Sequence, residues 1–295
     1  MGYAMKKVVD FVKPDSTDSF DKLAKIQRSS YLKSKGIKPN SAVQLDLFEI
    51  IGRDDLRHIP NDYARSSLFT ARNKREPRKS LMHEKLFHYN ECVTIQYSGQ
   101  ELRAEDDELV WLQILNYGKS VVLGEPFCFS IKDLVRDVGW SKNGRYYDKA
   151  RECITRLKTN EVRALNSKAY GVSGGISLIH NYVTINDGEG KPVDYRVWIA
   201  SNLIVMFAGN TFTSHTWEVY RGLSPVTRRL ADYIESHKLP YPLDIERFRQ
   251  MCGSNTTELS SWKQTVKKAC IELQTAGIAS YAVVQEDLIT CFRDR

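Results

Sequence analysis

Residues 244–273 read DIERFRQMCGSNTTELSSWKQTVKKACIEL, and this stretch decides the fold that we expect of the chain. Asp244 is of a residue type that caps helices, and the short amphipathic helix after it ends at a turn with Gly253. A longer amphipathic helix follows, and its apolar side chains recur at helical spacing at Trp262, Val266, Cys270 and Leu273. Two helices joined by a tight turn with glycine form a helix-turn-helix.

The same pattern occurs a second time in residues 130–157, which read SIKDLVRDVGWSKNGRYYDKARECITRL. Ser130 takes the place of Asp244, and Gly139 takes the place of Gly253. The later copy has two extra residues in its turn. The apolar positions of the longer helix in the earlier copy are Tyr146, Ala150, Ile154 and Leu157. Repetition of one supersecondary unit predicts two domains of similar build.

Strand-like runs follow each copy. After the first copy, β-rich runs at Glu161–Leu165, Gly175–Ile185 and Val193–Ile199 are separated by turns that contain glycine. After the second copy, Ile278–Val284 and Leu288–Phe292 predict a closing hairpin. A helix-turn-helix with a β-hairpin is a winged helix, so we expect an α+β chain with two tandem winged-helix domains.

The expected domain organisation follows from these units. Residues 1–52 carry many lysines and few apolar runs, which indicates a flexible basic N-terminal arm. The first winged-helix domain is expected over 53–210 and the second over 211–295. A length of 295 residues suits two domains, each with its own core.

Further helices are predicted outside the repeats. Asp106-Asp107 should cap a helix over Leu109–Leu115, which is apolar nearly all round and therefore central to the first domain. Asn61-Asp62 predicts a helix that continues through Phe69. Ser224-Pro225 combines an N-cap with proline at the first helical position, so it should begin a helix of the second domain.

Composition restricts the partner and the compartment. A net charge of +7 favours an anionic partner, although a balance of this size is common. The six cysteines include no C-x-x-C pair, which indicates free, mostly buried thiols in a reducing cytoplasm. No apolar run suits a signal peptide or a membrane span, so we expect a cytoplasmic protein that makes no membrane contact.

The outer faces of the two longer helices carry the candidate DNA contacts. On the first helix they are Lys142, Arg145 and Lys149, and on the second they are Ser260, Lys263, Gln264 and Lys267. Cations at these positions can neutralise phosphates, arginine can bind guanine with two hydrogen bonds, and glutamine can bind adenine. The alternative is an ordinary solvated helix face. The repetition of the pattern favours contact with double-stranded DNA.

A second basic group has no clear role in the sequence. It consists of Arg72, Lys74, Arg75, Arg78 and Lys79. These residues could follow a DNA backbone or form a hydrated linker, and the sequence favours neither alternative.

A short peptide, Gln44-Leu45-Asp46-Leu47-Phe48, resembles the Q-L-[SD]-L-F motif by which bacterial replication and repair proteins bind the sliding clamp of DNA polymerase III. In such a complex Leu47 and Phe48 fill an apolar pocket, and the Gln44 amide sets the register by hydrogen bonding. The alternative is a core strand, because Leu45 and Leu47 alternate with polar residues. We favour clamp binding.

Signatures of catalysis are incomplete. Gly118-Lys119-Ser120 resembles the end of a P-loop, but Gln113 stands where its first glycine belongs. His83 and His88 have no ligand partner at a zinc-like spacing. Tyr146 and its neighbour lack the histidine motif of a nicking replication enzyme. We therefore expect no enzymatic activity, no cofactor and no metal.

Several blocks of the chain together resemble the TrfA family, the replication initiators of broad-host-range IncP-type plasmids. The resemblance runs from about residue 42 to the end, and residues 1–40 lie outside it. The matching blocks are Gln44–Ile50, Pro60–Lys74, Glu101–Trp111, Gly139–Ala150, Leu223–Asp232, His237–Leu243 and Met251–Ser254.

This resemblance implies that two winged helices bind directly repeated origin sequences (iterons) as a monomer. It also implies opening of an adjacent AT-rich region, which makes single-stranded origin DNA a further candidate ligand. The host proteins that it implies are DnaA, the replicative helicase and the sliding clamp, with Gln44–Phe48 as the clamp-binding site. Dimers that are inactive at the origin are expected as well. The principal alternative function is a transcriptional repressor with tandem winged helices.

Overall fold

The computed structural model describes residues 54–119, 121, 125–166, 175–200 and 212–293, which all lie in one compact unit spanning residues 42–295. The predicted basic arm and the peptide Gln44–Phe48 lie outside the described residues. The described part mixes helices and strands, as an α+β chain should. None of its helices has both the length and the apolar character that a membrane span requires.

The helix α3, Asp107–Tyr117, lies at the centre of the core, as the sequence predicts. The Asp106 carboxylate caps it by accepting a hydrogen bond from the backbone N–H of Asp107, and the helix ends at Gly118. Every residue from Asp107 to Leu115 is buried. The indole of Trp111 packs against aromatic rings from the segment before it, with centroid distances of 5.8 Å to Tyr63 and 5.6 Å to Phe69.

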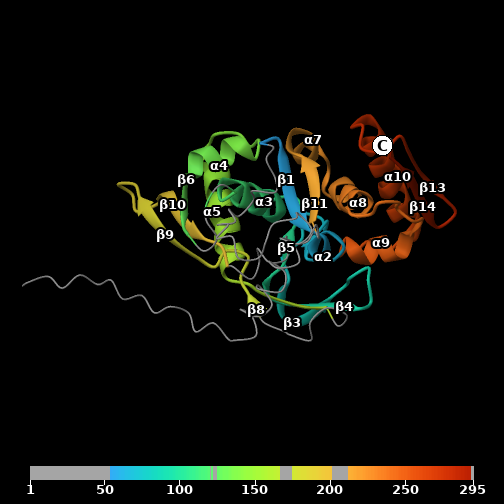
Figure 1. Ribbon diagram of the computed structural model, residues 1–295, viewed down its shortest axis with the longest axis horizontal. Coiled ribbons are helices and arrows are strands. Elements are labelled where there is room, and N and C mark those ends of the chain that lie inside the picture. The colour runs from blue at the N-terminus through green and yellow to red at the C-terminus, as the bar shows by residue number, and fades with distance from the viewer. Residues whose placement is uncertain (1–53, 120, 122–124, 167–174, 201–211, 294–295) are drawn as a thin grey trace, which may run out of the picture. The chain divides into compact units, whose positions relative to one another are not determined.

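Both predicted helix-turn-helix units form, each with a strand before it and a hairpin after it (Figure 1). In the first unit two further strands stand between the longer helix and the hairpin. The first unit consists of β6 (Phe127–Ser130), α4 (Ile131–Asp137), α5 (Gly144–Lys158), β9 (Asn181–Asn186) and β10 (Pro192–Trp198). The second consists of β12 (Leu243–Asp244), α9 (Ile245–Met251), α10 (Leu259–Thr275), β13 (Tyr281–Gln285) and β14 (Leu288–Phe292). A helix precedes each unit: α3 in the first and α8 (Pro225–Glu235) in the second.

The two small sheets have matching topology. Their strand orders are β6-β10-β9 and β12-β14-β13, so in each the strand before the short helix pairs with the second strand of the hairpin. The capping residues occupy equivalent registers, with Ser130 opposite Asp194 and Asp244 opposite Leu288. The repeat in the sequence is therefore a repeat of topology as well.

The remaining strands form one pair that connects the two halves of the chain and two sheets within the first half. β1 (Leu56–Pro60) pairs with β11 (Phe212–Thr216), and α7 (Trp217–Gly222) follows directly. A four-stranded sheet of order β3-β4-β7-β8 is inserted around the first unit. Its strands are β3 (Ser80–Leu86), β4 (Val93–Gln100), β7 (Glu161–Asn166) and β8 (Gly175–Ile176), and the short strands β2 (Phe69–Thr70) and β5 (Leu102–Arg103) form a separate parallel pair.

Two local predictions were wrong. The helix after Asn61 is a single turn, α2 (Asn61–Ala64), because Phe69 pairs with Leu102 in a strand instead of continuing the helix. The predicted strand Gly175–Ile185 is divided into β8 and β9, which belong to different sheets. The residues between these two strands are in no strand, and two of them, Leu178 and Ile179, are fully buried in the core.

Candidate nucleic-acid interface

Each candidate recognition helix is positioned by a capped short helix and a glycine turn. The Ser130 hydroxyl accepts a hydrogen bond of 3.0 Å from the backbone N–H of Asp133 at the start of α4. Asp244 accepts one of 2.8 Å from the N–H of Arg247 at the start of α9. Both turns pass through a left-handed glycine, with φ of 83° at Gly139 and 57° at Gly253. The local signals in the sequence thus fix the same geometry twice.

The inner faces of α5 and α10 are buried as predicted. On α5 the buried residues are Ala150, Cys153, Ile154, Arg156 and Leu157, while Tyr146 is half-buried against Trp140. On α10 they are Trp262, Val266, Ala269, Cys270 and Leu273. The indole N–H of Trp262 also donates a 3.0 Å hydrogen bond to the carbonyl of Ile245, which joins α10 to α9. The opposite face of each helix is left in solvent.

The three predicted DNA contacts of the first unit separate into two groups, and Lys142 lies in the turn before α5 rather than on the helix. Lys142 and Arg145 are exposed, and within the described part of the chain no hydrogen bond or ion pair engages them. Lys149 is half-buried, with its Nζ 4.7 Å from the ring centre of Trp140 and 3.6 Å from a carboxylate oxygen of Asp106. Its charge is therefore partly neutralised inside the protein, which periodicity could not show.

On α10 the predicted contacts divide in the same way. Ser260, Gln264 and Lys267 are exposed. Lys263 is half-buried and forms an ion pair with Asp287 in the β13–β14 turn. One predicted cation of each helix is thus engaged by an acidic group of the chain itself.

The turns of both hairpins are acidic, a feature that the sequence reasoning missed. The β9–β10 turn carries Asp187 and Glu189, with Lys191 paired to Glu189. A groove of about 440 Å³ separates this turn from the first turns of α5. The β13–β14 turn carries Glu286 and Asp287. Acidic tips repel phosphates, so the tips of the hairpins are unfavourable places for an anionic ligand.

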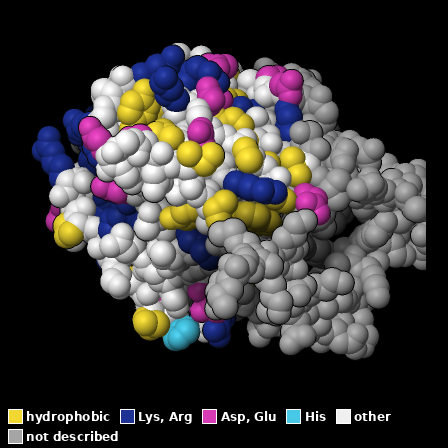
Figure 2. All heavy atoms as spheres, turned by 90° about the vertical axis from the view of Figure 1, so that its left-hand side faces the viewer, with side chains coloured by type: hydrophobic (Ala, Val, Ile, Leu, Met, Phe, Trp, Pro, Cys, Tyr) yellow, Lys and Arg dark blue, Asp and Glu magenta, His cyan; other side chains and the backbone are white. Residues whose placement is uncertain are grey.

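Figure 2 views the molecule from the side on which β9 and β10 lie in Figure 1. Lys and Arg side chains gather along the top and left of this view, with hydrophobic side chains between them and scattered acidic groups. Two of the exposed hydrophobic residues of the chain, Val183 and Ile185, lie on β9 and are 52% and 67% exposed. The charge on this face is local rather than a broad basic field.

The basic group Arg72–Lys79 is divided in the structure, and whether its exposed members contact DNA stays an open alternative. Arg72 and Arg78 turn inward, where Arg72 pairs with Glu101 at 3.0 Å and Arg78 pairs with Asp107 at 2.6 Å. The remaining cations of the group, Lys74, Arg75 and Lys79, are exposed. Two of its five cations are therefore parts of an internal ion-pair network, not of a hydrated linker.

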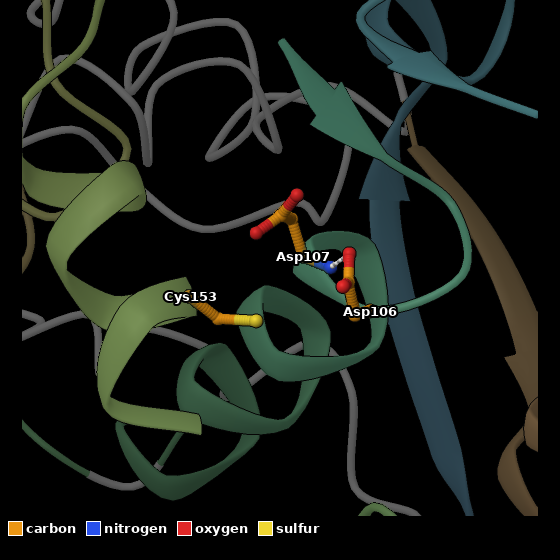
Figure 3. A group of neighbouring side chains, drawn as sticks. All are labelled: Asp106, Asp107 and Cys153. Atoms are coloured by element: carbon orange, nitrogen blue, oxygen red, sulfur yellow. Dashed lines mark hydrogen bonds between the residues drawn. The ribbon is translucent and has the colours of Figure 1, made fainter. Parts of the chain in front are cut away.

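One group of side chains resembles a metal site: Asp106, Asp107 and Cys153 lie within 4.8 Å of one another and are all buried (Figure 3). Guanidinium groups already occupy their acceptor atoms. Arg156 donates to Asp107 at 2.9 Å and to the sulfur of Cys153 at 3.2 Å, while Arg78 holds both carboxylates. Burial and the charge of Asp106 raise the pKa of Asp107 to about 6. The positions that a cation would neutralise are neutralised by arginine.

Comparison with known proteins identifies the family of the chain. A family model described as TrfA protein matches residues 14–293. The chain belongs to the TrfA family. The plasmid replication initiator protein TrfA of Escherichia coli is 46% identical over 252 residues, which cover 85% of this chain. The match covers 65% of the length of that relative, so about a third of the relative lies outside the alignment.

Solved structures add the fold. The crystal structure of domains 2 and 3 of RctB superposes on this TrfA-family chain with a TM-score of 0.53 at 12% identity, covering 79% of this chain and 96% of that one. A second structure of the same domains, RctB-155-483, gives a TM-score of 0.50 at 11% identity over 78% and 94%. At this level of identity the likeness shows a shared fold and nothing further.

Proposed function

We propose that this chain is a plasmid replication initiator that binds iteron DNA through two tandem winged-helix domains, 53–210 and 211–295. The observation that carries the proposal is the duplicated unit, with matching caps, left-handed glycines and strand orders, in a chain 46% identical to a plasmid replication initiator. A winged helix places its second helix in the major groove. We assign this role to α5 and α10.

The proposed contacts are the exposed side chains on the outer faces of these helices. Lys142 in the turn before α5, Arg145 of α5, and Gln264 and Lys267 of α10 are exposed and can reach phosphates and base edges. Ser260 adds a hydroxyl near the start of α10. The other two lysines in this assignment, Lys149 and Lys263, are half-buried and pair with Asp106 and Asp287. They would contact DNA after exchanging those carboxylates for phosphates.

Footprinting with single substitutions tests this assignment. Two helices that enter successive major grooves should protect roughly two helical turns per monomer, with centres about 10 base pairs apart. Arg145→Ala and Lys267→Ala should each weaken iteron binding and reduce the slope of log K against log salt by about 0.9 for each lost phosphate contact. Lys85→Ala removes an exposed charge on β3 and is the control that should change neither quantity. Unchanged affinity and slope in both helix variants would show that the wrong faces were assigned.

Further steps of initiation belong to the same proposal. We include opening of an AT-rich region with contact to the single strands, recruitment of DnaA and the replicative helicase, and a dimeric form that is inactive at the origin. A tandem winged-helix repressor remains the alternative. An array of direct repeats of about two helical turns beside an AT-rich tract near the gene would favour the initiator over the repressor.

Clamp binding is proposed for the peptide Gln44–Phe48 from its sequence, because these residues lie outside the described part of the structure. Replacing Leu47 and Phe48 by alanine removes two apolar anchors, each worth about 1.5–3 kcal/mol when buried in a partner. Retention on purified sliding clamp should fall by orders of magnitude, while iteron binding and the melting temperature stay at wild-type values. If the peptide is a core strand, the melting temperature falls instead.

A further inference from the structure

The turn before α10 is attached to a segment from the other half of the chain. The backbone N–H of Ala71 donates a 2.7 Å hydrogen bond to the carbonyl of Cys252, the residue before the turn glycine. Two residues beyond that glycine, the side-chain amide of Asn255 donates to both carboxylate oxygens of Glu76, at 2.7 and 2.6 Å. This hydrogen bond and the charge of Arg72 lower the pKa of Glu76, so the acceptor is ionised.

From Glu76 the contacts continue inward through Arg72. Its guanidinium binds Glu76 at 2.6 Å on one side and Glu101 at 3.0 Å on the other. Glu101 is 2% exposed and also accepts hydrogen bonds from the Thr70 hydroxyl at 2.6 Å and from Arg103 at 3.2 Å. A planar guanidinium between two carboxylates fixes direction as well as distance.

Arg78 continues this chain of contacts to the other recognition helix. One of its amino groups donates to the backbone carbonyl of Glu101 at 2.7 Å and to Asp107 at 2.6 Å, and the other binds Asp106. Asp107 in turn accepts a 2.9 Å hydrogen bond from Arg156, a buried residue of α5 (Figure 3 shows the two aspartates). An unbroken series of hydrogen bonds and ion pairs therefore joins α5 to the turn that begins α10.

We propose that this series of contacts, from Arg156 to Asn255, fixes the orientation of α5 relative to α10 and thereby sets the spacing of DNA half-sites that the protein accepts. The inference rests on the proposed function, because it needs both helices to contact one duplex. Arg72, Glu76 and Asn255 are positioning residues in this account, since they act through the helices and not on the DNA itself. We call the series the helix-to-helix network.

The geometry of DNA makes such a network a specificity device. Each base pair inserted between two half-sites moves one of them by about 3.4 Å along the axis and rotates it by about 34°. Two helices held rigidly cannot follow this change and lose the contacts of one half-site, whereas two helices on a loose connection can follow it. A rigid connection between α5 and α10 would therefore make the protein discriminate between spacers of different length.

The experiment measures the affinity of the full chain for duplexes that carry the footprinted site with its native spacer or with one, two or five inserted base pairs. The wild type should bind the altered spacers roughly 10- to 100-fold more weakly, since the loss of a few base contacts has effects of this size. Asn255→Ala and Glu76→Gln should reduce this ratio to within about threefold, and Arg72→Met should act in the same direction. Arg75→Ala, an exposed member of the same basic group, is the matched control and should keep the wild-type ratio.

The outcomes separate the possible failures. If Asn255→Ala and Glu76→Gln keep the wild-type ratio, the network does not set the spacing and this inference is overturned, while the proposed function stands. If the wild type itself binds every spacer equally, two-helix reading fails and both proposals fall. A uniform loss of affinity on all duplexes, together with a lower melting temperature, shows a merely structural role and also overturns the inference. Should Arg72→Met fail to fold, the two milder variants still decide the result.

Discussion

Replacing Arg229 by methionine should destabilise the chain more than most other single changes. Arg229 lies on α8 and has no exposed surface. Its guanidinium forms ion pairs with two fully buried carboxylates, Glu108 at 3.0 Å and Asp232. It also donates to the backbone carbonyls of Ala64 at 2.8 Å and Ser66 at 2.7 Å. This one side chain thereby connects α8 with α3 and with the segment after α2.

The size of the loss in stability follows from the acidic groups that the substitution leaves without a partner in the core. Methionine replaces the aliphatic stem but supplies neither charge nor donors, so two acids of like sign remain buried. Burial and the charge of Asp232 raise the pKa of Glu108 to about 7 even with Arg229 in place. Removing one partner of a buried ion pair costs about 3–5 kcal/mol. In a chain of this size, that loss corresponds to a fall of roughly 6–20 °C in melting temperature.

Urea denaturation and a thermal melt would measure this loss. Lys191→Met is the matched control, because it breaks an ion pair with Glu189 whose side chains are 54% and 77% exposed. We expect the control to cost less than about 0.5 kcal/mol. Adding Glu108→Gln to Arg229→Met should restore part of the stability, since it removes one of the uncompensated acids. A loss from Arg229→Met below about 1 kcal/mol would refute the reasoning.

Two further predictions concern a turn and a pH dependence. Gly253→Ala should lower the free energy of unfolding more than Gly277→Ala does. Both glycines have a left-handed backbone, but a Cβ at Gly253 would lie 2.7 Å from Thr70, whereas a Cβ at Gly277 would meet open space. Equal losses of stability in urea denaturation would contradict this prediction. Burial lowers the pKa of His215, but the charges and hydrogen bonds of Glu235 and Asp232 together outweigh burial and raise this pKa from 6.5 to about 10. The folded chain holds this proton more tightly than the unfolded chain does. The loss in free energy of unfolding caused by His215→Gln should therefore be largest below pH 6.5 and should vanish as the pH rises through about 10. A loss that does not depend on pH would contradict the ion pair.

Local signals were sufficient to predict the two helix-turn-helix units. Ser130 and Asp244 cap their helices, and both turns pass through glycine with positive φ. The hairpin at the end of the chain also forms where its alternating pattern placed it. A cap, a glycine and a stripe of apolar residues all act over a few neighbouring positions, so their effect can be read from neighbours in sequence.

Contacts between distant residues were beyond the reach of such signals. Arg72 and Arg78 looked like surface cations. Apart from Glu76, which lies four residues after Arg72, their partners lie 23 or more residues away along the chain. Lys149 lies on the face that periodicity assigns to DNA, and the fold brings Asp106 close to its ammonium group. Sequence patterns give the face of a helix, whereas the charge that meets this face is decided by tertiary structure.

The two helix-turn-helix units differ in how the turn before the longer helix is capped. In the earlier turn, Asn143 caps α5 by accepting a 3.1 Å hydrogen bond from the N–H of Tyr146. In the later turn, which is one residue longer between its two helices, Glu258 occupies the capping position and makes no such bond. The asparagine of that longer turn, Asn255, reaches Glu76 instead. The extra length therefore gives up a local cap and gains a contact with the other half of the chain. A turn whose only role was to begin α10 would keep a capping side chain. We therefore take the contact between Asn255 and Glu76 to be the role of the longer turn.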